Sequence, residues 1–144
     1  MTTTASRRWI SAWIGAAALG VANGASRETL YADATGDEAA HVLSTGTLLA
    51  VLSGYMWLLQ RRWPLSTRRE ALSVGAAWTG MTVAFEFGFG HWVAGEPWSA
   101  LLDNYNVSAG RVWALVPFAM ATGPELARQL TQSEDPVSDP ALTA

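Results

Sequence analysis

Four long apolar runs alternate with short polar segments along the chain, and this alternation predicts four helices. The runs cover residues 9–27, 41–60, 69–93 and 107–128. A helix of about 20 residues rises roughly 30 Å, which matches the hydrocarbon thickness of a bilayer. The pattern therefore predicts an all-α fold, a bundle of four transmembrane helices that forms a single domain over residues 1–128.

The polar segments between the runs carry signals for helix starts. Thr35 followed by Glu38 has the spacing of a capping box, in which a hydroxyl and a carboxylate satisfy free backbone N–H groups at the first turn. Ser66 or Thr67 is a candidate cap for the third helix, with Glu70 suitably placed. These signals predict that the second and third helices begin directly after the two polar segments.

Three further segments are expected to differ from a regular spanning helix. Pro117 frees the carbonyl of Trp113 and should kink the fourth helix. Residues 129–144, rich in Ser, Asp and Pro, are expected to form a disordered cytoplasmic tail. Between the third and fourth runs, a one-sided apolar stripe predicts a short interfacial helix at the membrane surface. The stripe consists of Trp98, Leu101, Leu102 and Tyr105.

The N-terminal run also has a second interpretation. Arg7 and Arg8 precede an apolar run with small residues near Ala22, which is the pattern of a cleaved signal peptide. Residues 6–10 have a weak similarity to a twin-arginine signal. We favour a spanning helix, because no soluble domain that would be exported follows this run.

The composition agrees with a membrane protein and excludes several other classes. Only 15% of the residues are charged, against about 25% in soluble domains. Eight Trp and thirteen Gly suit interfacial anchoring and close helix packing. There is no Cys, which excludes disulfides, thiolate metal sites and Cys nucleophiles. The net charge of −3 gives no indication of nucleic-acid binding, so the expected partner is the lipid bilayer.

The distribution of arginine predicts the orientation. If the N-terminus faces the cytoplasm, seven of the nine basic residues lie on the cytoplasmic side, and only Arg27 and Arg111 lie outside. This sorting follows the positive-inside rule. It predicts a multi-pass membrane protein with the N-terminus and the C-terminus both cytoplasmic. The seven are Arg7, Arg8, Arg61, Arg62, Arg68, Arg69 and Arg128.

Glu86 is the single carboxylate within the apolar part of the third run. A carboxylate at membrane depth is costly and marks a function or a specific ion pair. By helical rise, Glu86 lies about 24 Å above residue 70, in the outer third of the bilayer. Arg27 and Arg111 are expected at a similar height, so we expect Glu86 to pair with one of them.

Other polar residues are expected at the same level. Asp103 and Tyr105, in the loop after the third helix, are candidates for a lid over this layer. A structural ion pair, a site for a ligand, lipid or ion, and protonation coupled to transport all remain open as roles for the layer. The other expected members are Asn23, His41, Ser44, Thr45 and Thr82.

No catalytic, metal or cofactor motif is evident. The chain lacks a phosphate loop, a nucleophile elbow and a zinc-protease motif. His41 and His91 could join Glu86 or Asp103 around a divalent ion, but their spacing matches no metal motif. We therefore expect no metal, no cofactor and no catalytic residue, and an enzyme is not the favoured interpretation.

The third helix is expected to have two packing faces. Thr79, Thr82 and Glu86 share one face, and small residues at four-residue spacing occupy the opposite one. Small residues allow close approach of membrane helices. The third helix is therefore either central in the bundle or also a contact in a homodimer or larger membrane complex. The small residues are Ala76, Gly80, Ala84 and Gly88.

Five short strings combine polar, aromatic and small residues. They are Asn23-Gly24 with Arg27-Glu28, His41 with Ser44-Thr45, Arg61-Arg62-Trp63-Pro64, Phe85-Glu86-Phe87-Gly88-Phe89-Gly90 and Gly110-Arg111-Val112-Trp113. As a set they resemble strings in a group of small, uncharacterised four-helix integral membrane proteins of bacteria. The resemblance covers most of residues 9–120 and implies a fold and a location in the bacterial inner membrane, but no activity. Small multidrug transporters share the size, but their membrane Glu is in the first helix.

Two functions follow from these patterns. The first is a small transporter or ligand-binding membrane protein with an outward-facing polar pocket around Glu86. The alternative is a non-catalytic accessory or assembly subunit in which a Glu–Arg layer is purely structural.

Overall fold

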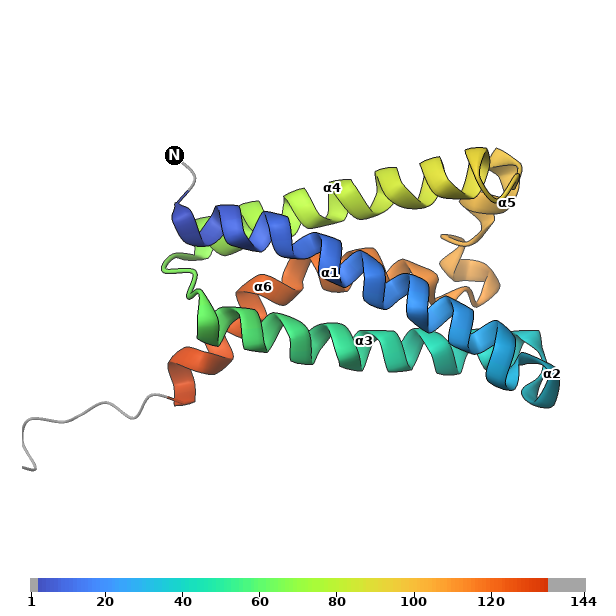
Figure 1. The fold of residues 1–144 in the computed structure, drawn as a ribbon, viewed down its shortest axis with the longest axis horizontal. Helices are drawn as coiled ribbons and strands as arrows, with labels where there is room; N and C mark the ends of the chain where they lie inside the picture. Colours follow the sequence, from blue (N-terminus) through green and yellow to red (C-terminus); the bar gives the residue numbers. More distant parts are fainter. Residues whose placement is uncertain (1–2, 135–144) are drawn as a thin grey trace, which may run out of the picture.

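The computed structural model describes residues 3–134, except for the side chain of Ala32, and these residues form a bundle of four long helices. The helices are α1 (Thr4–Ser26), α3 (Asp37–Arg62), α4 (Arg68–Trp92) and α6 (Leu115–Glu134). They run alternately up and down along one long axis (Figure 1). No strand occurs within the described range, so the all-α prediction is confirmed.

The four long helices form a closed ring of contacts. α1 and α6 each pack against both α3 and α4, and they lie on opposite sides of the bundle, in front and behind in Figure 1. One end carries the helix termini with Arg7, Arg8 and the segment 61–69, and we call it the basic end. The other end carries the connections 27–36 and 93–114, and we call it the acidic end.

The start of α4 agrees with the sequence, whereas the start of α3 does not. The Thr67 hydroxyl accepts a hydrogen bond from the Glu70 N–H (3.2 Å), as predicted. The prediction of a capping box at Thr35 and Glu38 is wrong, because the residue before α3 is Gly36, with φ 83°, and no side chain caps the start of α3. Helical turns at Arg27–Tyr31 and α2 (Ala32–Thr35) occupy the connection, and the Thr35 hydroxyl donates to a carbonyl within them.

The fourth helix begins later and ends later than predicted. Residues before it form two short 3₁₀ turns, Val107–Ala109 and Val112–Ala114. Pro117 therefore lies in the first turn of α6, where its missing N–H breaks no helical hydrogen bond, and the predicted kink there is wrong. Residues 129–134 are helical rather than disordered. Residues 135–144 of the predicted tail lie outside the described residues.

The short helix between the third and fourth long helices is confirmed as α5 (Trp98–Asp103). Leu101 is buried, and the Cβ of an alanine at Gly90 of α4 would meet its side chain. Trp98 stacks against Phe87 and against the ring of His91, whose centroid lies 3.9 Å away. α5 is thus held against the end of α4, while its placement at a membrane surface stays a prediction.

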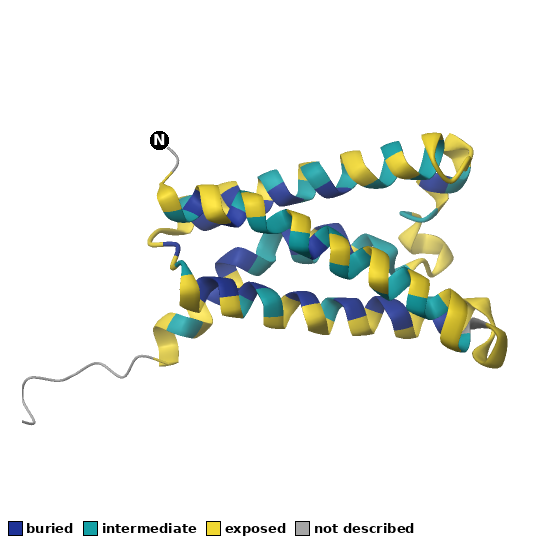
Figure 2. Ribbon diagram, in the orientation of Figure 1, coloured by how far each residue is buried: buried dark blue, intermediate teal, exposed yellow. Residues whose placement is uncertain are grey.

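Two tryptophans form the centre of the core near the basic end. Trp9 and Trp78 are fully buried with ring centroids 5.7 Å apart. The Trp78 indole donates to the Trp9 carbonyl (2.9 Å), and the Trp9 indole donates to the Trp63 carbonyl (3.0 Å). These bonds connect α4, α1 and the loop after α3. Figure 2 shows that the acidic-end connections, in contrast, are mostly exposed.

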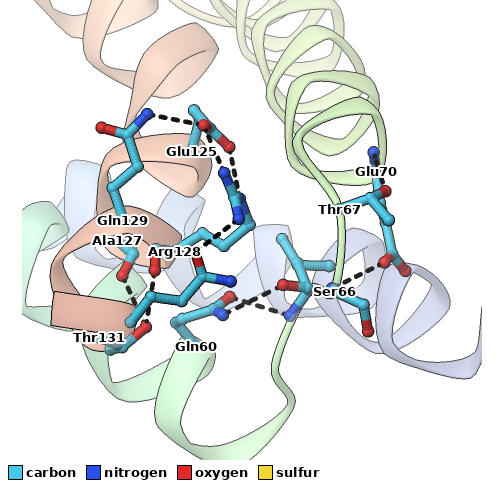
Figure 3. Close-up of polar contacts among 11 residues, drawn as sticks. Gln60, Ser66, Thr67, Glu70, Glu125, Ala127, Arg128, Gln129 and Thr131 are labelled. Carbon is cyan, nitrogen blue, oxygen red and sulfur yellow. Dashed lines mark hydrogen bonds and ion pairs between the residues drawn. The ribbon is translucent and has the colours of Figure 1, made fainter. Parts of the chain in front are cut away.

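Side-chain contacts also fix the polar residues of the basic end, which Figure 3 shows in detail. The Glu125 carboxylate accepts hydrogen bonds from Arg128 (2.7 and 2.8 Å) and from Gln129 (2.7 Å). The side-chain amide oxygen of Gln60 accepts a hydrogen bond from the Leu65 N–H (3.0 Å). Both Glu125 and Gln60 are buried, so these bonds satisfy polar groups that have little contact with solvent.

The surface of the bundle carries many large apolar side chains. Large apolar side chains are exposed on every long helix, among them Ile14, Leu58, Phe85 and Phe118. By length and hydropathy together, only one of the described helices, Asp37–Arg62, is a candidate membrane span. A bundle with four membrane spans therefore stays a prediction.

Candidate functional site

A cavity of about 170 Å³ lies between the four long helices, toward the acidic end. α1 lines it with small residues and Trp13, α3 with two leucines, and the start of α6 with Val116 and Met120. Its walls are almost entirely apolar, with polar groups contributed by one face of α4. The complete lining is Trp13, Ala16, Ala17, Gly20, Val21, Leu48, Leu52, Thr82, Phe85, Glu86, Trp113, Val116 and Met120.

Thr82 and Glu86 supply the polar face of this cavity. They are four residues apart on α4, so their side chains lie one above the other. The buried Thr82 hydroxyl accepts a hydrogen bond from the Trp13 indole (3.0 Å). The Glu86 carboxylate accepts a hydrogen bond from the Tyr105 hydroxyl. Trp113 approaches the same carboxylate and completes the wall.

The expected pairing of Glu86 with an arginine is wrong. Among the described residues, Glu86 forms no ion pair, and its hydrogen-bond partner is Tyr105. Arg27 instead contacts the Nδ1 atom of His41 (3.1 Å) and the carboxylate of Glu28 (3.3 Å).

Two features of the fold explain this difference. α1 lies beside α4 near the basic end but leans toward α3 at the acidic end (Figure 1), which carries Arg27 away from Glu86. Because α6 begins only at Leu115, Arg111 is in the connecting segment rather than in a helix. There it pairs with Asp103 at 3.3 Å, with both side chains about half exposed.

The predicted polar layer is therefore divided between two pairs of elements. Between α1 and α3, the Asn23 amide donates to the Ser44 hydroxyl (2.6 Å) and to the Ser44 carbonyl (3.0 Å). Arg27 and His41 make the next contact toward the acidic end. Thr45 is buried beside Ser44, and its hydroxyl has no hydrogen-bond partner within the described part of the chain.

Trp113 lies at the boundary between the two groups. Its ring centroid is 6.1 Å from that of His41, and it also lies close to the Glu86 carboxylate at the cavity wall. Beyond it, an open polar basin of about 550 Å³ lies at the acidic end, where it is lined by Arg27, His41 and Arg111 together with acidic residues. Of the expected residues, two line the cavity and three line the basin, whereas Asn23, Ser44 and Thr45 line neither, so they do not form one pocket.

The two candidate lid residues behave differently. Tyr105 does reach Glu86, whereas Asp103 points to Arg111 at the exposed surface. Burial, together with the hydrogen bond to the Glu86 carboxylate, raises the pKa of Tyr105 well above its ordinary value. Tyr105 therefore keeps its proton and remains a donor to Glu86 throughout the physiological pH range.

Replacing Tyr105 with phenylalanine should lower the free energy of unfolding by about 1–3 kcal/mol, because it leaves a largely buried carboxylate without its donor. Tyr55→Phe is the comparison, since the Tyr55 hydroxyl donates to the Ala12 carbonyl, a backbone group of a helix (2.9 Å). Loss of the Tyr55 hydrogen bond should lower the free energy of unfolding by a smaller amount. Thermal unfolding of both variants in detergent measures the difference, and an equal loss would contradict the assigned role of Tyr105.

Trp13 and Trp113 belong to the site but were not among its expected members. The sequence shows Trp13 one helical turn after Trp9, so both are expected on one face of the first helix. No pattern in the sequence places Trp113 beside Glu86, because the predicted fourth helix begins too early.

Comparisons with protein-family models, with curated proteins and with solved structures give no match to this chain. The resemblance to small bacterial membrane proteins accordingly stays a prediction.

Proposed function

We propose that the chain is a four-helix integral membrane protein that binds a small, mostly apolar ligand between its helices, with Glu86 as the polar contact. The cavity of about 170 Å³ carries this proposal, because all four long helices line it and one carboxylate borders it. A cavity needs a few convergent polar groups in an apolar wall to orient a ligand, and Thr82 and Glu86 have this arrangement.

Side-chain exposure supports the membrane location. Ile14 is 69% exposed and Phe118 is 66% exposed, although both lie within long helices of the bundle. Polar residues such as Ser44 and Thr82 are instead buried. Apolar residues facing outward around a partly polar interior suit lipid as the surrounding solvent. At the acidic end, Trp92 and Trp98 are exposed, as interfacial tryptophans are in membrane proteins.

The size and lining of the cavity limit the ligand. An apolar cavity of about 150 Å³ in another protein holds one benzene molecule. The ligand of this cavity should therefore have a body of roughly one aromatic ring and one donor or cationic group directed toward Glu86. Gly20 and Ala16 leave this space open on the α1 side.

The cavity borders the surface between α1 and α4. Val21 of α1 and Phe85 of α4 both line the cavity, and both are exposed. In a membrane this surface would face lipid, so an apolar ligand would enter from the bilayer.

Benzylamine and toluene are suitable probes, because they share a ring and differ in one cationic group. Both should raise the melting temperature of the purified protein in detergent. Glu86→Gln should remove the larger part of the benzylamine effect and leave the toluene effect. Gly20→Leu fills the cavity and should abolish both effects.

Gly24→Leu is the matched control, since it makes the same change one turn further along α1, outside the cavity lining. It should leave both ligand effects intact. No response to either probe, or a response that Gly20→Leu does not change, would contradict the proposal. A transport role would further require flux of the bound ligand across reconstituted vesicles.

A structural role as an accessory subunit is the second candidate, and the existing contacts of the polar residues favour it. Tyr105 already donates to Glu86, and Asn23 already donates to Ser44. If these bonds only hold the bundle together, Glu86→Gln should lower the melting temperature without any ligand. The two probes would then have no effect on the wild-type protein.

A further inference from the structure

A second hollow lies on the surface between α1 and α3, at the basic end. It is an open groove of about 520 Å³, formed by the first turns of α1 and the last turns of α3. The cavity beside Glu86 shares none of its lining residues. Arg7 and Arg8 lie at its rim, and Ala12, Tyr55 and Trp63 are among the residues that form its walls.

The charge of this groove has one sign. Arg7 and Arg8 line it, and no carboxylate does. Within residues 3–134 neither arginine forms an ion pair. The guanidinium of Arg8 lies 5.5 Å from the ring centroid of Trp63, and that of Arg62 lies 5.8 Å from the same ring. An aromatic face holds these cations without neutralising them, so they remain able to bind an anion.

The nearest acidic group on α4 has other partners. The Glu70 carboxylate accepts hydrogen bonds from the hydroxyls of Thr3 and Ser6 (2.6 Å for Ser6) and from the Ser66 N–H (3.1 Å). These bonds join the start of α1 to the start of α4, and Glu70 does not line the groove. The two rim arginines therefore keep their charge available on the α3 side of α1.

The polarity of the groove changes along its length. Ala12 is one turn beyond Arg8 on α1, about 6 Å further from the basic end. At this level the walls include Ala12 and the ring of Tyr55, whose hydroxyl donates to the Ala12 carbonyl (2.9 Å), and Leu59 lies one turn nearer the basic end on α3. A bound molecule would thus meet guanidinium groups first and an apolar wall about one helical turn deeper.

We propose that this groove is a specific site for an anionic phospholipid of the leaflet at the basic end. Arg7 and Arg8 bind the phosphate through guanidinium hydrogen bonds, and the first part of an acyl chain lies against Ala12, Leu59 and Tyr55. The inference rests on the proposed membrane location and not on the ligand of the Glu86 cavity.

The test uses a pair of matched double variants of the full chain. Arg7→Gln/Arg8→Gln removes two charges from the groove, and Arg68→Gln/Arg69→Gln removes two charges from the same end, at the start of α4 and outside the groove. Native mass spectrometry of protein released from detergent counts retained lipid. The probes are phosphatidylglycerol, which is anionic, and phosphatidylethanolamine, which is zwitterionic.

The wild-type protein and Arg68→Gln/Arg69→Gln should retain one phosphatidylglycerol in preference to phosphatidylethanolamine. In Arg7→Gln/Arg8→Gln the ratio of retained phosphatidylglycerol to retained phosphatidylethanolamine should fall at least tenfold. An equal loss of the preference for phosphatidylglycerol in the two double variants would show that it depends only on the overall charge of this end, and would overturn the proposal. Equal retention of the two lipids would also overturn it. So would full competition by free glycerol phosphate at equal concentration, since that result would assign a phosphate site without a lipid.

The outcome is independent of the ligand cavity. Gly20→Leu should leave phosphatidylglycerol retention unchanged while it abolishes the benzylamine effect. If the chain stays soluble without detergent and does not enter vesicles, the membrane location itself fails. If the chain enters vesicles but shows no preference for the anionic lipid, only the groove assignment fails.

Discussion

Gly75→Ala should separate α4 from α6 and lower the free energy of unfolding by about 3 kcal/mol, the upper part of the range for overpacked cores. A Cβ at Gly75 would collide with the backbone carbonyl of Ala121, and the carbonyl of Met120 lies next to it. Backbone atoms cannot rotate away as a flexible side chain can, so the two helices would have to shift. Thermal and denaturant unfolding of the purified protein in detergent measures the loss.

Gly80→Ala is the matched control for Gly75→Ala. Gly80 is on the same helix and is exposed, and a Cβ added there would have no neighbouring atom within 4 Å. Because alanine favours a helix over glycine by about 1 kcal/mol, this variant should be neutral or slightly more stable. Equal destabilisation by the two substitutions would show that the close contact between α4 and α6 does not limit stability.

Trp78→Ala should destabilise the protein by about 3–5 kcal/mol, as large-to-small substitutions of buried aromatic residues do. Trp78 is fully buried against Trp9, and its indole donates to the Trp9 carbonyl. The substitution removes both the ring and this link between α4 and α1. A sharp fall in melting temperature and in the yield of folded protein is the expected result.

Trp92→Ala provides the comparison, because Trp92 is on the same helix but 75% exposed. In detergent it should change the melting temperature little. The melting temperature of Trp78→Phe should lie between those of Trp78→Ala and Trp92→Ala, since the phenylalanine keeps most of the buried volume but loses the hydrogen bond. If Trp92→Ala lowered the melting temperature as much as Trp78→Ala, the assignment of Trp78 to the core would be wrong.

The sequence predicts four long helices and the approximate ranges of three of them, but neither the start of α6 nor how the helices lean on one another. Hydrophobic runs of about 20 residues set the approximate ranges, and Thr67 with Glu70 marks the start of α4 correctly. Residue depth along each helix also follows from the rise per residue. Periodicity gives depth and facing within one helix, and it contains no information on which neighbour a helix approaches at each end.

This limit explains the outcome at Glu86. Depth alone predicts Arg27 beside Glu86, but the lean of α1 toward α3 gives Arg27 the His41 ring as its neighbour. Tyr105 is predicted as a lid residue, and the structure makes it the hydrogen-bond donor to Glu86. Such a contact depends on the path of an irregular segment, here residues 93–114, which no hydrophobic period describes.

The unequal attachment of α1 has a mechanical consequence. Near the basic end, Trp9 and Ser6 bind α1 to α4 and its preceding loop, whereas near the acidic end Asn23 ties α1 to α3. α4 and α6, in contrast, touch backbone to backbone at Gly75. A ligand larger than the cavity would therefore have to break the hydrogen bonds of Trp13 to Thr82 and of Asn23 to Ser44 before α1 could move about its first turns, while α4 and α6 stay packed.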